Sequence, residues 1–172
     1  MNQSKPPFIK TSRLCLQSLR EKDMDAMIEI VSDPFVTRSY MIPDFPTRKE
    51  AEDFFYRLKA ATERKDRFIY AIYLGQEVIG FINEVACEGK GMELGYFIAY
   101  PHWNHGYATE ALSAAIQTLF DLGLTCIEAA HFEENPASGK VMEKAGMHRI
   151  DKEETIPYRG KNHRCLYYQI EQ

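Results

Sequence analysis

The chain has 172 residues, of which 45% are hydrophobic and 27% charged, and its formal net charge is −4. This is the size and composition of one ordinary globular domain, and the slight acidic excess argues against the basic surface that nucleic-acid binding requires. No window approaches about 18 uninterrupted apolar residues, and the N-terminus lacks the apolar core of a secretory signal. We therefore expect a cytoplasmic protein that contacts neither membranes nor nucleic acids.

The first part of the chain predicts a strand and two helices. Alternating apolar residues predict a strand over 13–19, and apolar residues at helical spacing predict a helix that begins near residue 21 and that Pro34 ends. Thr47 and Glu50 have the spacing of a capping box, which predicts a second helix through about residue 65.

The middle of the chain predicts an antiparallel meander. Two β-rich runs, 67–74 and 77–86, flank Gly75-Gln76, a two-residue turn in which glycine supplies a positive φ. A second glycine-rich turn leads into a third strand at about 92–100.

The second half predicts two helices and three further strands. Asn135 can cap the second of these helices, with Pro136 in its first turn, and Gly123 ends the first. The step from the third strand of the meander through the first of these helices to the next strand should be a right-handed parallel crossover. The predicted helices cover 106–122 and 135–146, and the predicted strands 124–132, 147–156 and 163–170. The whole is a mixed sheet with helices on its faces.

The four cysteines are scattered, and no pair has C-x-x-C spacing. Structural zinc sites draw closely spaced ligand pairs from tight turns, so this pattern argues against one. Each cysteine lies in an apolar run, where a thiol packs as a small hydrophobic group. We expect Cys15, Cys87, Cys126 and Cys165 to be free thiols in or near the core, in a reducing compartment.

The segment PHWNHGYATEAL, residues 101–112, joins a strand to a helix and carries the strongest chemical signal. The first N–H groups of the helix lack intrahelical partners and lie at the positive end of its dipole. Gly106 and Ala108 leave this backbone uncovered, and Thr109 adds a hydroxyl donor. Such a turn suits a phosphate or pyrophosphate, although a tight turn without any ligand explains the same residues equally well.

A metal explains the segment less well. His102 and His105 lie in the turn rather than inside the helix, and no nearby carboxylate or cysteine completes a ligand set. Neither a Walker A sequence nor G-x-G-x-x-G follows a strand, so the chain lacks the usual binding motifs for nucleoside triphosphates and dinucleotides.

WNHGYATEAL resembles the acyl-CoA-binding signature of the GNAT acetyltransferases, Q/R-x-x-G-x-G/A. Gly106-Tyr107-Ala108 matches its closing part, whereas Trp103 replaces the first residue, a departure common in the RimJ/RimL-like branch that acetylates ribosomal-protein N-termini. Further segments resemble that branch in order, so the likeness covers nearly the whole chain: TSRLCLQSLREKD, DPFVTRSYMIPDFPTRKEAEDFF, MELGYFIAYPHWNHGYATEA, NPASGKVMEKAGM and YRGKNHRCLYYQI. The resemblance implies that residues 1–172 form a single GNAT domain. This domain would have a mixed, mostly antiparallel seven-stranded sheet, splayed central strands and about four flanking helices.

The resemblance also implies an acetyl-CoA site. The pyrophosphate would lie on the amides of Asn104, His105, Gly106, Tyr107, Ala108 and Thr109. The pantetheine would lie beside Phe97, Ile98 and Ala99, pairing with an exposed strand edge as a peptide does. Asn135 and Ser138 would reach the pantetheine and the thiol end. Alternatively, Asn135 serves only to cap its helix, and Ser138 only faces solvent.

Catalysis in this family is direct transfer, in which a neutral amine attacks the thioester carbonyl with help from a general base and a hydrogen-bond donor. The resemblance makes Glu93 the best base, although a carboxylate with a structural role explains it as well. Glu84 and His131 are weaker candidates. Met142 stands where many members have a proton-donating tyrosine, so Ser138 is the nearest hydroxyl that could donate.

These features predict an N-acetyltransferase that uses acetyl-CoA and no metal, and acetylates a protein N-terminus or a small amine. The alternative is a CoA-binding sensor of the same fold without catalysis, which Met142 favours and Glu93 disfavours. The sequence leaves the acceptor, the acyl-chain preference and the choice between monomer and homodimer open.

Overall fold

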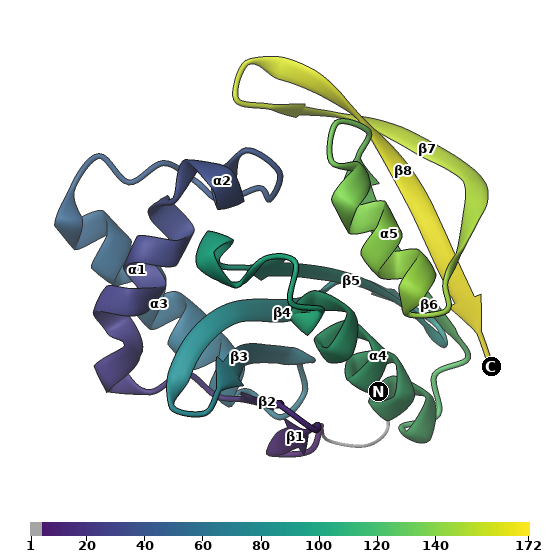
Figure 1. Cartoon of the computed structure of the whole chain (residues 1–172), viewed down its shortest axis with the longest axis horizontal. Coiled ribbons are helices and arrows are strands. Elements are labelled where there is room, and N and C mark those ends of the chain that lie inside the picture. Colours follow the sequence, from purple (N-terminus) through teal and green to yellow (C-terminus); the bar gives the residue numbers. More distant parts are fainter. Residues whose placement is uncertain (1–4) are drawn as a thin grey trace.

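The computed structural model describes residues 5–172 and places its strands in one sheet (Figure 1). Within these residues the sheet has eight strands in the order β1-β2-β3-β4-β5-β6-β8-β7. They are β1 (Phe8–Lys10), β2 (Leu14–Gln17), β3 (Ile69–Leu74), β4 (Glu77–Glu88), β5 (Gly91–Ile98), β6 (Cys126–Phe132), β7 (His148–Tyr158) and β8 (Lys161–Glu171). Only β5 and β6 pair in parallel among these strands, as the predicted crossover requires.

Five α-helices and two short 3₁₀ helices complete the described part of the chain. They are η1 (Glu21–Asp23), α1 (Met24–Ser32), α2 (Pro34–Thr37), α3 (Arg48–Glu63), η2 (Tyr100–His102), α4 (Tyr107–Asp121) and α5 (Pro136–Lys144). The predicted capping box begins α3, where the Thr47 side chain accepts the Glu50 N–H and the Glu50 carboxylate accepts the Thr47 N–H.

The helices cover both faces of the sheet, so its centre has two cores (Figure 1). α4 and α5 pack on one face, and α1 and α3 on the other. Strand β3 shows the consequence, since Tyr70 on one face and Tyr73 on the other are both fully buried. A strand buried on both sides reads as a continuous apolar run, which is what IYAIYL is.

The two central strands separate where the site lies. β5 pairs with β6 only from Gly91 to Leu94, although both strands continue beyond this stretch. On its other side β5 pairs with β4 as far as Ile98, with a bulge between Glu84 and Ala86. The splayed strands implied by the sequence are therefore confirmed, and one edge of β5 is left open.

The structure corrects the predicted elements in three places. The eighth strand, β1, was missed because it has only three residues and buries only Ile9. Asp33 and Pro34 end α1 as predicted but also begin α2, since the Asp33 carboxylate accepts the Phe35 N–H at 2.8 Å. The last hairpin is longer than predicted, because β7 and β8 continue to a tight turn at Arg159-Gly160.

The cysteine prediction is partly wrong. All four thiols are free, Cys165 is buried, and Cys15 and Cys126 are half-buried. Cys87, however, is exposed, because the end of β4 extends past β3 and pairs only with the start of β5.

None of the helices in the described residues is long and apolar enough to span a membrane.

Candidate cofactor and catalytic site

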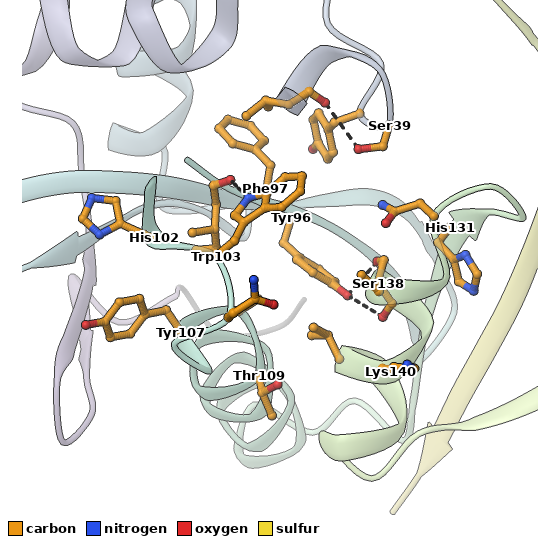
Figure 2. Close-up of a pocket in the computed structure, with 18 of the residues that line it drawn as sticks. Ser39, Tyr96, Phe97, His102, Trp103, Tyr107, Thr109, His131, Ser138 and Lys140 are labelled. Atoms are coloured by element: carbon orange, nitrogen blue, oxygen red, sulfur yellow. Dashed lines mark hydrogen bonds between the residues drawn. The ribbon is translucent and has the colours of Figure 1, made fainter. Parts of the chain in front are cut away.

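A cavity of about 350 Å³ opens at the splay between β5 and β6. Its walls come from the second half of β5, the start of α4, the end of β6, the length of α5 and the segment after α2 (Figure 2). Tyr107 and Thr109 of α4 and Ser138 and Lys140 of α5 are among the residues that line it. The structure thus brings segments more than 30 residues apart in sequence to one cavity.

Most of the predicted site residues line this cavity. Three do not: Ala99, whose N–H bonds to the Ile79 carbonyl on β4 at 2.8 Å; His105, which is exposed; and Glu93. Those that line it are Phe97, Ile98, Asn104, Gly106, Tyr107, Ala108, Thr109, Asn135 and Ser138.

The start of α4 has the backbone geometry of an anion cradle. Gly106 precedes the helix with φ +79° and Asn104 has φ +63°, both in the left-handed region that glycine and asparagine tolerate best. The first intrahelical bond runs from the Glu110 N–H to the Gly106 carbonyl at 3.0 Å. The N–H groups of Tyr107, Ala108 and Thr109 precede that bond and lie at the positive end of the helix dipole.

Arg13 and Glu110 hold the start of α4 against the turn between β1 and β2. The Glu110 carboxylate accepts hydrogen bonds from Thr11 Oγ1 at 2.6 Å and Arg13 Nε at 2.6 Å, and Arg13 Nη1 donates to the His105 carbonyl at 2.9 Å. Burial alone would raise the pKa of Glu110, but these bonds outweigh it and lower the pKa to about 2. The carboxylate is therefore ionised and neutralised by Arg13, so it does not oppose an anion at the helix start.

The cavity is suited to an anionic ligand. None of the described residues that line it is Asp or Glu, although the chain has 25 acidic residues against 21 basic ones. Lys140 and Lys144 line it one helical turn apart on α5, and neither forms an ion pair with any residue of the described chain. Two free ammonium groups opposite the start of α4 make this groove locally positive.

Trp103, which replaces the signature's first residue, has a structural role that the sequence did not reveal. Its indole Nε1 donates to the Ile98 carbonyl at 2.7 Å. Successive residues of a strand point their backbone groups to opposite sides, and Ala99 donates toward β4. The backbone groups of Tyr96 and Ile98 therefore face the open edge, where the indole already occupies the Ile98 carbonyl.

A hydroxyl pair lies at the inner end of the cavity. Figure 2 shows the Tyr96 ring pointing toward Ser138, and the Tyr96 hydroxyl is 2.9 Å from Ser138 Oγ and 3.2 Å from the Ser138 carbonyl oxygen. Burial is the main reason that the pKa of Tyr96 is raised, so this hydroxyl stays protonated and can act as a hydrogen-bond donor. Sequence reasoning missed Tyr96, because a tyrosine on an apolar strand reads as an ordinary core residue.

The start of α5 differs from the predicted cap. Asn135 occupies the N-cap position, but its side chain makes no capping hydrogen bond to any described residue, and the Ser138 N–H bonds to the Asn135 backbone carbonyl at 3.1 Å instead. The Asn135 side chain is thus available to the cavity that it lines. Met142, one turn after Ser138, is buried in the core.

α5 approaches β6 closely at Gly139. A Cβ placed there would lie 2.7 Å from His131 Nε2 and 3.1 Å from the Tyr168 hydroxyl. The His131 ring has little room to yield, because it is buried and its Nδ1 is 2.7 Å from the Phe132 carbonyl oxygen. His131 is thereby held beneath α5, where it packs against the helix.

Gly139→Ala is therefore expected to destabilise the protein by about 1–3 kcal/mol, the usual cost of overpacking a core. For a chain of this length that lowers the Tm by roughly 2–12 °C. Thermal unfolding measures the shift, and His131→Ala/Gly139→Ala supplies the control. Removal of the ring should make the alanine at 139 less costly in the double variant than in the wild-type background. Additive losses would contradict the contact.

The two carboxylates proposed as bases have different surroundings. Glu84 forms an ion pair with Arg67 and accepts the Phe68 N–H at 2.7 Å, which is a structural role. Glu93 is half-buried on the strand face that also carries Gly95, one pleat from the cavity. Burial raises the pKa of Glu93, Glu128 raises it further, and Lys152 lowers it.

In the described chain, no three His, Cys, Asp or Glu side chains gather as a group that could hold a metal ion.

Comparison with known proteins agrees with this geometry. The model of the acetyltransferase (GNAT) domain matches residues 13–148. The uncharacterized N-acetyltransferase YoaA of Bacillus subtilis (strain 168) is 29% identical over 148 residues, which cover 83% of this chain and 84% of that protein. A GNAT-family acetyltransferase structure from Bacillus anthracis is 28% identical with a TM-score of 0.81, over 95% of this chain and 98% of that chain.

The structure of RimL, a ribosomal L7/L12 alpha-N-protein acetyltransferase in complex with coenzyme A, is also similar. It has a TM-score of 0.80 over 95% of this chain and 97% of that chain, at 18% identity. At that identity the likeness concerns the fold.

Proposed function

The chain belongs to the GNAT acetyltransferase family and is an acetyl-CoA-dependent N-acetyltransferase, and we propose that it acetylates the primary amine of a protein N-terminus or of a small molecule. The observation that carries the proposal is one carboxylate-free cavity that joins an open strand edge, a helix start and a buried hydroxyl pair. The name and fold of RimL support an N-terminal acceptor. We further propose that residues 1–172 act as one cytoplasmic domain, as a monomer or homodimer.

The chain's own residues fit acetyl-CoA. The N–H groups of Tyr107, Ala108 and Thr109 would bind the pyrophosphate, with the ammonium of Lys140 or Lys144 neutralising its charge. The Tyr96 backbone groups and the Ile98 N–H at the open edge would pair with the pantetheine amides, and Asn135 would hydrogen-bond beside them. The thioester would then lie near Ser138, where acetyl-CoA supplies an electrophilic carbonyl carbon.

Glu93 is the proposed general base. It lies outside the cavity lining, one pleat from Gly95, so it would accept the amine proton through a water molecule. As that proton leaves, the nitrogen bonds to the carbonyl carbon and the carbon–sulfur bond breaks. The Tyr96–Ser138 pair would donate a hydrogen bond to the departing sulfur, which takes its proton there or from water. This pair would supply the hydrogen-bond donor that Met142, at the position of the family's usual tyrosine, cannot supply.

Glu93→Gln is expected to lower the rate of transfer at pH 7 by about 100-fold or more, because an amide cannot accept the amine proton. Since burial raises the pKa of Glu93 above the ordinary value of a glutamate, the wild-type rate should rise with pH in two steps, one from Glu93 and one from the acceptor amine. Glu93→Gln should keep only the step that comes from the acceptor amine. Rates measured against pH at saturating acetyl-CoA, for wild type and for the variant, give both steps.

Glu128→Gln is the matched control. Glu128 raises the pKa of Glu93 and also binds Lys152, which lowers it. Its loss should move the acidic step to lower pH without abolishing transfer. Loss of folding does not explain a slow Glu93 variant, because the folded state favours protonated Glu93 and its charge costs stability as the pH rises through the folded pKa. An unchanged profile in Glu93→Gln would assign the base elsewhere.

The last hairpin contacts the segment that follows α2, which we propose borders the acceptor. The Tyr158 hydroxyl lies 2.6 Å from the Thr37 carbonyl oxygen and 3.1 Å from the Tyr40 carbonyl oxygen, and Arg159 pairs with Asp44. This bridge favours a slender acceptor, such as a small amine or a free chain end, over a side chain on a broad folded surface.

A screen of small primary amines and short peptides with free N-termini tests the proposed function. Acetyl-CoA consumption that depends on an added amine, with the acetylated amine identified by mass spectrometry, would support it. Tight acetyl-CoA binding without transfer to any amine would favour the non-catalytic sensor.

A further inference from the structure

A second cavity of about 210 Å³ lies on the other face of the sheet, under α3. Leu58 and Ala61 of α3 form one wall, and Ile69 of β3 and Phe81 of β4 form the opposite wall. Met41, which is 52% exposed, stands at its rim. Of the residues proposed above to bind acetyl-CoA or to move the proton, Phe97 lines this space, and it lines the cofactor cavity as well.

The second cavity adjoins the cofactor cavity. Tyr40 and Phe97 line both spaces, and their rings are in edge contact with centroids 4.9 Å apart. The Tyr40 hydroxyl donates to Asn83 Oδ1 at 2.5 Å and sits against Gly95, where an added Cβ would lie 3.0 Å from it. This pair of rings therefore lies between the second cavity and the cofactor cavity, with the Tyr40 hydroxyl beside Gly95.

The lining of the second cavity suits an uncharged, apolar group. Eight of its twelve lining residues are aliphatic or aromatic without a polar atom, apart from the sulfur of Met41. The charged members, Glu84 and Arg67, neutralise each other, and Tyr40 and Asn83 are hydrogen-bonded together. An ammonium or carboxylate placed here would lose its hydration, and the charged and polar groups that line the cavity are already paired with one another.

Resting on the proposed function, we propose that the second cavity binds an apolar side chain or aryl group of the acceptor, carried close to its reactive amine. The amine lies beside Gly95, and its substituent displaces the Tyr40 ring from Phe97 to enter the space under α3. The acceptor class is therefore an amine with a branched aliphatic or aromatic substituent, such as a peptide with leucine or phenylalanine first, or phenylethylamine. Polyamines and acceptors with an acidic substituent fit this space poorly.

Matched acceptors test the proposal. Peptides that differ only in their first residue, glycine against phenylalanine, and ethylamine against phenylethylamine, are compared by kcat/KM at saturating acetyl-CoA. Wild type is expected to prefer the larger member by about tenfold or more, the range that one apolar contact gives. Ala61→Leu fills the cavity and should reduce that preference at least about fivefold. Ala60→Leu, on the exposed neighbour, should leave it unchanged.

Each outcome decides between the two proposals. The apolar subsite would be overturned if wild type had the same kcat/KM for the larger and the smaller acceptor of each pair. It would also be overturned if Ala61→Leu and Ala60→Leu changed the ratio of these two constants equally. In both cases the proposed acetyl transfer would stand. If none of these four acceptors is acetylated but polyamines or amines with an acidic substituent are, the proposed subsite is wrong, although the proposed acetyltransferase activity stands. Transfer to no amine at all would overturn both.

Discussion

Acetyl-CoA binding is expected to weaken at least about tenfold, or 1.4 kcal/mol, in Gly106→Val. Gly106 has φ +79°, and a residue with a side chain costs about 1–2 kcal/mol in that conformation. A β-branched valine should relieve this strain by turning the backbone, which moves the N–H groups at the start of α4. The space itself is not the obstacle, because the nearest atom to an added Cβ is Arg13 Nη2 at 3.5 Å.

Gly123→Val is the matched control for strain. Gly123 lies just after the other end of α4, has φ +88° and has no described atom within 4 Å of an added Cβ. Both variants should lose stability by a similar mechanism, but only Gly106→Val should lose affinity. Calorimetric titration of acetyl-CoA and thermal unfolding of both variants separate the two effects. Full affinity in Gly106→Val would mean that the phosphates bind elsewhere, and equal losses in both variants would trace the loss to stability.

Tyr96→Phe is expected to lower kcat by about 100-fold to 1,000-fold, as the loss of one transition-state donor does in a buried site. The ring and its packing remain, so the Kd and KM for acetyl-CoA should change little. A fall in kcat without a rise in KM is the signature of a group that acts in the transition state. Steady-state kinetics with a fixed amine and varied acetyl-CoA give both constants.

Ser138→Ala distinguishes the two hydroxyls. It removes the bond to Ser138 Oγ but leaves the Ser138 carbonyl 3.2 Å from the Tyr96 hydroxyl, which keeps that group in place. If Tyr96 is the donor, Ser138→Ala should cost less than Tyr96→Phe, and the double variant should cost little more than Tyr96→Phe alone. A larger loss from Ser138→Ala would assign the donor role to serine, as the sequence by itself suggested.

The elements were predictable where their signals are local. The capping box of Thr47 and Glu50, the glycine turn at Gly75 and the start of α4 near Gly106 each depend on residues within one turn. Their hydrogen bonds and φ angles are set by neighbours in sequence, so the pattern identifies them. The three-residue strand β1 escaped prediction because so short a segment shows no periodicity.

The sequence by itself determined the family, the mixed sheet with its parallel crossover, and most of the residues that line the cofactor cavity. Only the tertiary structure decided which hydroxyl faces Ser138, what Trp103 does at the strand edge, and that Glu93 lies one pleat outside the cavity. Tyr96 and Ser138 are 42 residues apart, and each of these facts depends on how far the sheet splays and where α5 sits on it. Packing between distant segments sets those distances, and no local pattern in the chain encodes them.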